Sequence, residues 1–197
     1  DPGEQYAVLG RDYIDPKYID VTRNSKTIEE GSISGTGYRD TLNVYAKGKL
    51  NDGILAEYAN GSYPFHYVAW NTKSQTSKDV VITFDLGKAY LLTSASFRAP
   101  AYADAAQVNK YTVEYAFSAD AKTWAKTIAG TWTTDGTIPL SYANDAPQTV
   151  YKNQTTADVN ATYRYVKITI KFPASATKTE LNIDEIMIFG KNSGSST

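Results

Sequence analysis

Residues 59 to 70, ANGSYPFHYVAW, gather aromatic side chains around the only histidine of the chain. Tyr63, Phe65 and Tyr67 lie next to His66 in sequence, an Asn-Gly-Ser turn precedes them, and Pro64 interrupts the run. Aromatic rings with a polar tip suit half-exposed sheet positions, and they equally suit recognition of a sugar or a protein. The stretch is therefore either a core strand or a surface built to hold a ligand.

Arg98, within SFRAPAYADAAQVNKY, is a second residue with binding chemistry. A guanidinium presents a rigid fork of donors that can clamp two vicinal hydroxyl groups. Alternatively, Arg98 ends a strand and forms an ion pair with Asp104 or Glu57. The sequence supports both interpretations equally.

Catalysis finds little support in the sequence. The chain has one His and no Cys, and it lacks a Gly-x-Ser-x-Gly elbow, a His-Glu-x-x-His motif and a phosphate-binding glycine loop. No pair among the 21 acidic residues is marked as the carboxylate pair of a glycoside hydrolase. We therefore expect a protein that is not an enzyme.

Composition narrows the range of partners. With 20 Lys and Arg against 21 Asp and Glu, no net field attracts nucleic acid or an anionic membrane. The absence of Cys excludes disulfides and zinc–thiolate sites. No apolar run approaches the roughly 20 residues of a membrane-spanning helix. Because the chain starts at Asp1-Pro2 without Met or a signal peptide, we expect a processed protein or an excised domain.

Alternating apolar residues predict the elements that must position these side chains. The segments are DVVITFDLG from Asp79, which Gly87 is expected to close, YTVEYAF from Tyr111, YRYVKITI from Tyr163, and LNIDEIMIFG from Leu181. Turn clusters SADAKTW, TTDGTIP and YANDAP separate strands. Helical periodicity is absent, so an all-β sandwich or jelly roll is expected. Its predicted interior includes Phe84, Val113, Tyr115, Val166 and Ile168.

Taken in order, several segments resemble the discoidin family, meaning coagulation-factor type C domains and family 32 carbohydrate-binding modules. They are GYRDTLNVYAKGKLNDG, Trp70, VVITFDLGK, YTVEYAFSADAKTW, YRYVKITI and IDEIMIFG. Two positions depart from the family pattern, Asn51 in the Leu-x-Asp-Gly turn and Ala121 where glycine is usual, and we expect both to preserve the backbone geometry. The resemblance implies a sandwich over residues 31–190. The N-terminal extension over 1–30 has apolar residues without a clean period and is expected to add an edge strand or to wrap the sandwich, and the polar, Gly/Ser-rich composition of 191–197 predicts a flexible tail.

The resemblance also implies a structural calcium ion bound by Asp52 and Glu185. Calcium takes six to eight oxygen ligands, which loop carbonyls and carboxylates supply. Glu185 has the parity of Ile183, Met187 and Phe189, so a buried face there would require a positive partner for its carboxylate. The alternative is that Asp52 belongs to a simple turn and that Glu185 is an exposed strand residue.

Finally, the resemblance implies a shallow sugar site. Its expected members are His66, Arg98, Tyr63, Phe65 and Tyr102, with Tyr67, Trp132 and Tyr142 as further loop aromatics and Trp70 as a core residue beneath a loop over 59–67. The expected function is a non-catalytic module that binds a neutral glycan and is tethered within a secreted or cell-surface protein. The alternatives are a protein-binding or cell-adhesion domain and a membrane-surface domain. Tyr- and His-rich loops and balanced charge argue against the membrane version.

Overall fold

The computed structural model describes residues 19–20, 26–32, 50, 55, 68–71, 79–100, 108–138, 148–173 and 180–192. Within these ranges the chain is all-β, as predicted. The strands are β1 (Ile19–Asp20), β2 (Lys26–Ser32), β3 (Val68–Asn71), β4 (Asp79–Pro100), β5 (Thr112–Ser118), β6 (Lys126–Ile138), β7 (Gln148–Thr155), β8 (Ala161–Lys171), β9 (Glu180–Ile183) and β10 (Glu185–Asn192). None of the described segments forms a helix long and apolar enough to cross a membrane.

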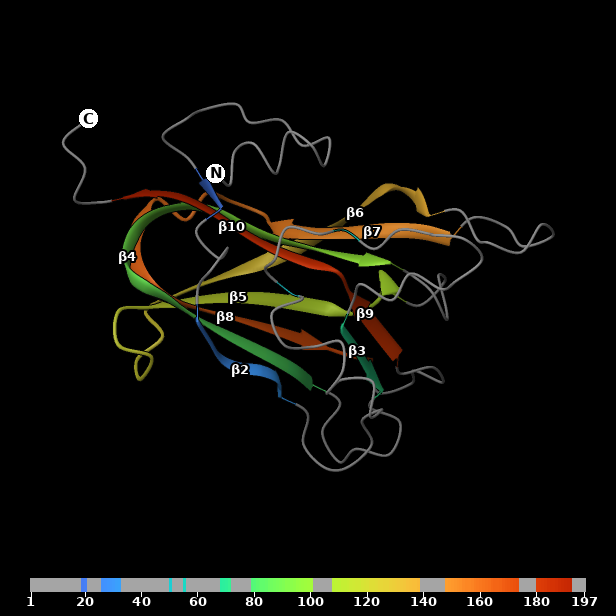
Figure 1. Ribbon diagram of the computed structural model, residues 1–197, viewed down its shortest axis with the longest axis horizontal. Coiled ribbons are helices and arrows are strands. Elements are labelled where there is room, and N and C mark those ends of the chain that lie inside the picture. Colours follow the sequence, from blue (N-terminus) through green and yellow to red (C-terminus); the bar gives the residue numbers. More distant parts are fainter. Residues whose placement is uncertain are drawn as a thin grey trace.

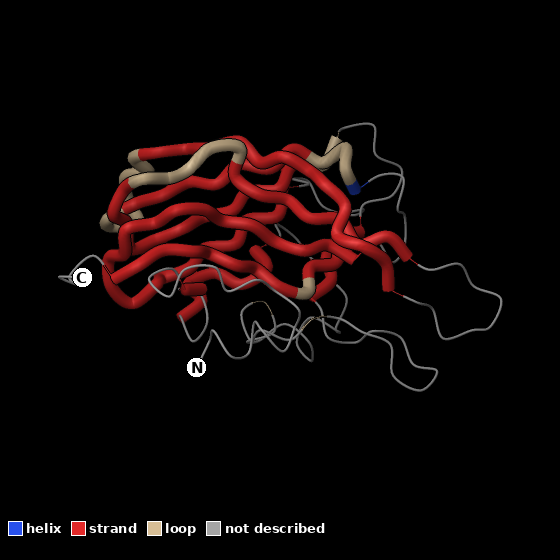
Figure 2. Tube along the Cα trace, turned by 90° about the horizontal axis from the view of Figure 1, so that it is seen from above, coloured by secondary structure: helices blue, strands red, loops and turns tan. Residues whose placement is uncertain are grey.

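Five strands close a circuit, because β4 pairs with both β7 and β8 and the order β4-β7-β6-β5-β8 returns to β4. The circuit forms two layers, which Figure 1 shows joined at the bend of β4. β10 extends the layer that contains β7, and β1 pairs with β10. β2 pairs with the first half of β4. Seen from above, the strands of one layer run side by side along the molecule (Figure 2).

β4 belongs to both layers because it continues through Gly87. The expectation that Gly87 would end this strand was wrong. Its φ of 88° allows a bulge, and the register with β8 shifts between Asp85 and Tyr90. The second half of β4 then pairs with β10 and β7. The bulge therefore carries the chain from one layer into the other and places Arg98 within a strand.

The core lies between the two layers, and the predicted interior is confirmed. Phe84, Tyr115, Val166 and Ile168 are completely buried, and Val113 is nearly so. The rings of Phe97 and Tyr115 come from β4 and β5, with centroids 6.4 Å apart. Alternate residues of a strand point to opposite faces, so one face of each of these strands fills the core.

Two segments differ from their predicted form. TTDGTIP does not separate strands, because β6 runs through it to Ile138, with a register shift between Thr134 and Thr137 and a φ of 81° at Gly136. The run from Leu181 is two strands, because Asp184 interrupts it and β9 pairs with β3 instead of β4. In both segments, pairing with the neighbouring strands decides whether the chain continues as one strand, as at Gly136, or divides into two, as at Asp184.

The SADAKTW turn is confirmed between β5 and β6. Asp120 Oδ1 accepts hydrogen bonds from the amides of Lys122 and Thr123, at 2.8 and 2.9 Å. Ala121 has a φ of 61°, in the left-handed region. The expectation that alanine preserves the backbone geometry here is confirmed, although a Cβ atom makes this conformation less favourable than it is for glycine.

Candidate functional site

A row of polar side chains crosses the outer face of the layer built from β10, β4, β7 and β6. Glu185 of β10 is in register with Arg98 of β4, which is in register with Lys152 of β7. Phe97 and Ile186, the next register pair, belong to the core, so this row lies on the opposite face of the same strands. Arg98 is buried and Glu185 is completely buried. The fold thus brings together one predicted sugar-binding residue and one predicted calcium ligand.

Arg98 makes two ion pairs with other described residues. Its Nε lies 3.3 Å from Oδ2 of Asp135 in β6, and its Nη2 lies 3.6 Å from Oδ2 of Asp184. The Arg98 side chain is 9% exposed, Asp184 is fully buried, and Asp135 is 46% exposed. The guanidinium thus lies between an inner carboxylate and an outer one.

Within the described residues, the acidic partners of Arg98 are two that the sequence did not suggest. Asp104 and Glu57 lie outside the described residues, whereas Asp135 and Asp184 are reached across the sheet. Asp184 also donates its backbone N–H to the Arg98 carbonyl oxygen at 3.2 Å. Sequence reasoning missed both residues, because Asp135 was assigned to a turn and Asp184 was treated as one residue of a continuous strand.

Glu185 lies on a buried face of β10, the case in which the sequence analysis expected its carboxylate to need a positive partner. Its side chain is buried, as is that of Met187 two residues on, and Arg98 occupies the facing position on β4. Ile183 departs from this parity, since it belongs to the main core and Asp184 separates it from β10. A buried carboxylate requires a compensating positive charge or hydrogen bonds, and Arg98 brings a cation to this row.

The Leu-x-Asp-Gly turn begins beside this row. The carbonyl oxygen of Leu50 accepts a hydrogen bond from the Ile186 amide at 2.6 Å. Leu50 therefore contacts the residue that follows Glu185 in sequence. This contact agrees with the predicted proximity of residues 31–53 and 181–190. Carboxylate oxygens of Asp184 and Glu185 are the donor type that a hard cation prefers, so these residues fit calcium chemistry. Asp52 lies outside the described residues, and these contain no group of three or more His, Cys, Asp or Glu side chains arranged to hold a metal.

The other predicted contacts divide into two groups. The first group lies outside the described residues and comprises His66, Tyr63, Phe65, Tyr67, Tyr102 and Tyr142. The second group consists of Trp70 and Trp132. The backbone of Trp70 pairs with Leu181 in the small β3–β9 sheet. Trp132 was expected in a loop but lies in β6. Its ring meets Phe97 edge-on at 5.4 Å, and its Nε1 donates to the Tyr111 carbonyl oxygen at 2.7 Å. Trp132 is therefore a packing residue.

A second polar pair is enclosed in the core. The Tyr115 hydroxyl donates to Asn153 Oδ1 at 2.8 Å, and both residues are completely buried. Burial raises the pKa of the Tyr115 phenol well above its ordinary value, so the hydroxyl keeps its proton and remains a donor. A Cβ atom at Gly130 would lie 2.0 Å from Asn153 Oδ1. This pair is a packing feature, separated from the outer row by the sheet itself.

Similarity to solved structures supports the fold. A scan against protein-family models and a search of curated proteins found no match. A putative chitobiase fragment from Bacteroides thetaiotaomicron aligns with a TM-score of 0.54 and 17% identity, over 91% of this chain and 96% of that one. A fucose binding module from Streptococcus pneumoniae gives 0.52 and 9%, over 90% and 99%. The lectin domain of lectinolysin, complexed with Lewis b antigen, gives 0.51 and 14%, over 87% and 96%.

Proposed function

We propose that this chain is a non-catalytic carbohydrate-binding module of the discoidin and family 32 type, with a jelly-roll sandwich. The observation that carries the proposal is the shared fold along 87 to 90% of the chain with two proteins whose descriptions name fucose binding and Lewis b antigen. The role is to hold a neutral glycan so that a tethered domain of a secreted or cell-surface protein works at high effective concentration.

Arg98 supplies the polar recognition in this proposal. Its guanidinium is planar and lies between Asp135 and Asp184, and a pre-organised fork loses less entropy on donating to sugar hydroxyls than a free side chain does. His66 and Tyr102 are proposed to supply further hydrogen bonds, and Tyr63 and Phe65 to cover the apolar C–H face of a pyranose ring. Such shallow sites bind in the micromolar to millimolar range, on the order of −4 to −8 kcal/mol.

A glycan array followed by calorimetry tests the proposal. We expect the unmodified chain to bind neutral oligosaccharides, and His66→Ala and Arg98→Lys each to weaken binding about tenfold or more through loss of hydrogen bonds to hydroxyls. Arg98→Lys retains the positive charge beside Asp184 but loses the planar guanidinium. It therefore distinguishes the contribution of the guanidinium hydrogen bonds to binding from that of the ion pair. A chain that binds no glycan on the array, while its melting transition is intact, contradicts the proposal.

We further propose that Asp52 and Glu185 hold a structural calcium ion at the Leu50 turn. The hydrogen bond between Leu50 and Ile186 supports this, because it holds the start of the turn against the backbone of the residue that follows the buried Glu185. An ion that binds only the folded state stabilises it by RT ln(1 + [L]/Kd). Chelation should therefore lower the melting temperature, and elemental analysis should find calcium. An unchanged melting temperature with EDTA, together with absence of metal, would remove calcium from the proposal.

A further inference from the structure

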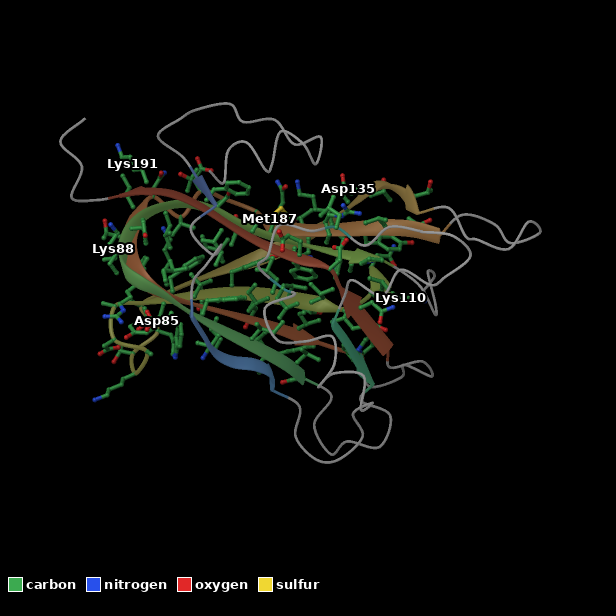
Figure 3. The ribbon with its side chains drawn as sticks, in the orientation of Figure 1. Asp85, Lys88, Lys110, Asp135, Met187 and Lys191 are labelled. Atoms are coloured by element: carbon green, nitrogen blue, oxygen red, sulfur yellow. The ribbon has the colours of Figure 1, made fainter. Side chains whose placement is uncertain are left out.

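The ion pair between Arg98 and Asp135 joins a hydrogen-bond donor to a hydrogen-bond acceptor near the surface. Asp135 lies on the outer side of its layer (Figure 3) and its side chain is 46% exposed, whereas Arg98 below it is 9% exposed. The contact with Arg98 uses Oδ2 of Asp135, and within the described part of the chain it is the ion pair found for this carboxylate. Oδ1 is thus available to a group that approaches from solvent.

The charge around Arg98 is dominated by carboxylates. Asp135 and Asp184 contact the guanidinium, and Glu185 faces it in register across β4 and β10. Lys152 is the second cation of the row, on the other side of Arg98. Among the described residues, two cations are therefore set against three carboxylates, and the most exposed of these carboxylates is that of Asp135. An arriving anion meets Asp135 before it meets Arg98.

We propose that Asp135 is a ligand-binding residue of the Arg98 site and that it selects neutral sugars over acidic ones. This inference rests on the proposed glycan-binding function and adds a residue and a selection rule to it. A sugar hydroxyl both donates and accepts, so one hydroxyl can accept from the Arg98 guanidinium while its neighbour donates to Asp135. A sialic acid, uronic acid or sulfated sugar offers an anion that the Asp135 carboxylate repels.

The bulge in β6 explains how Asp135 reaches this position. The register with β7 shifts between Thr134 and Thr137, and Gly136 adopts a φ of 81°. A bulge redirects the side chains of its strand, and bulges are frequent beside binding sites. Because the Asp135 side chain is 46% exposed, its carboxylate can be reached by a ligand hydroxyl, while Asp184 contacts Arg98 from the other side.

A microarray of matched glycans tests the inference. It carries neutral oligosaccharides ending in galactose, fucose or N-acetylglucosamine, each beside its sialylated or sulfated counterpart. The proteins are the unmodified chain, Asp135→Ala, Asp135→Asn and, as a matched exposed carboxylate in the turn after β7, Asp158→Asn. Melting temperatures measured in parallel verify that all four are folded.

We expect the unmodified chain and Asp158→Asn to bind neutral glycans at least tenfold more strongly than their acidic counterparts. Asp135→Ala should lose about tenfold to a hundredfold in neutral binding, the effect of removing a charged acceptor from a ligand hydroxyl. Asp135→Asn, which keeps an acceptor without the charge, should narrow the gap between neutral and acidic glycans. If the unmodified chain binds neutral glycans and neither Asp135 variant changes that binding or its selectivity, the inference fails while the proposed function stands. Absence of any binding by the unmodified chain overturns both.

Discussion

The turn at residues 118–124 and the cluster around Arg98 are both networks of polar groups, but they are held in different ways. In the turn, Asp120 Oδ1 and Ser118 Oγ bond to groups no more than five residues away. In the cluster, Arg98, Asp135 and Asp184 come from β4, β6 and the junction of β9 and β10. The turn therefore depends on one segment, whereas the cluster exists only once the sheet has assembled.

The difference shows in burial. Apart from the buried Ser118, most of the turn is exposed, so the Asp120 carboxylate can return to water if a bond breaks, whereas Asp184 is completely buried and cannot. Loss of a partner is therefore much more costly in the cluster than in the turn.

Arg98→Met should lower the free energy of unfolding by about 3 kcal/mol, because it removes the cation that pairs with the buried Asp184 carboxylate. Urea unfolding measures the change. Arg98→Lys is the control and should lose less, since an ammonium group stays near Asp184. Equal stability of Arg98→Met and the unmodified chain would show that the cluster is not held by this ion pair.

Gly130→Ala should destabilise the fold by about 1–3 kcal/mol through overpacking. The added Cβ atom would meet Asn153 Oδ1 at 2.0 Å and a Tyr115 ring carbon at 3.0 Å, so the buried pair must shift. Gly136→Ala is the control with open space around the new atom and only the strain of a φ of 81°. We expect the Gly130 variant to have a lower melting temperature than the Gly136 variant. The reverse order would mean that Asn153 and Tyr115 can shift at little energetic cost to accommodate the new atom.

Ala121→Gly should stabilise the chain by about 0.5–1 kcal/mol, because glycine adopts the φ of 61° without steric cost. Ala119→Gly, in the same turn and outside the left-handed region, should instead be neutral or slightly destabilising, since it only adds flexibility to the unfolded chain. Chemical denaturation of the two variants side by side distinguishes relief of strain from a general effect of glycine.

The smallest expected effect is on pH dependence in the turn. Hydrogen bonds from the amides of Thr123 and Lys122 hold the pKa of Asp120 below its ordinary value in the folded state. A lowered folded pKa contributes stability above the unfolded pKa, and this is lost as pH falls through the folded pKa. The melting temperature of the unmodified chain should therefore exceed that of Asp120→Asn at neutral pH and approach it below about pH 4. A gap that stays constant down to pH 2 would contradict this assignment.

Several features of this protein follow from the sequence alone. Alternation along a strand is a local property, so Val80, Ile82 and Phe84, like Val166 and Ile168, could be assigned to the core before the fold was known. The turn after Ser118 follows equally from its own residues, because short polar side chains next to backbone amides favour turns. Glu185 was recognisable as a carboxylate that would need a cation if its face were buried.

Other features were decided by tertiary structure. Gly87 and Gly136 suit either a chain reversal or a bulge, and only the strands paired on each side make them bulges within β4 and β6. The partners of Arg98 could not be inferred, because ion pairs across a sheet depend on register between strands far apart in sequence. His66, Tyr63, Phe65, Tyr102 and Asp52 remain predictions from sequence. Periodicity and turn chemistry are encoded within a few neighbouring residues, whereas which acid meets Arg98 is determined only when β4, β6 and β10 are brought into one layer.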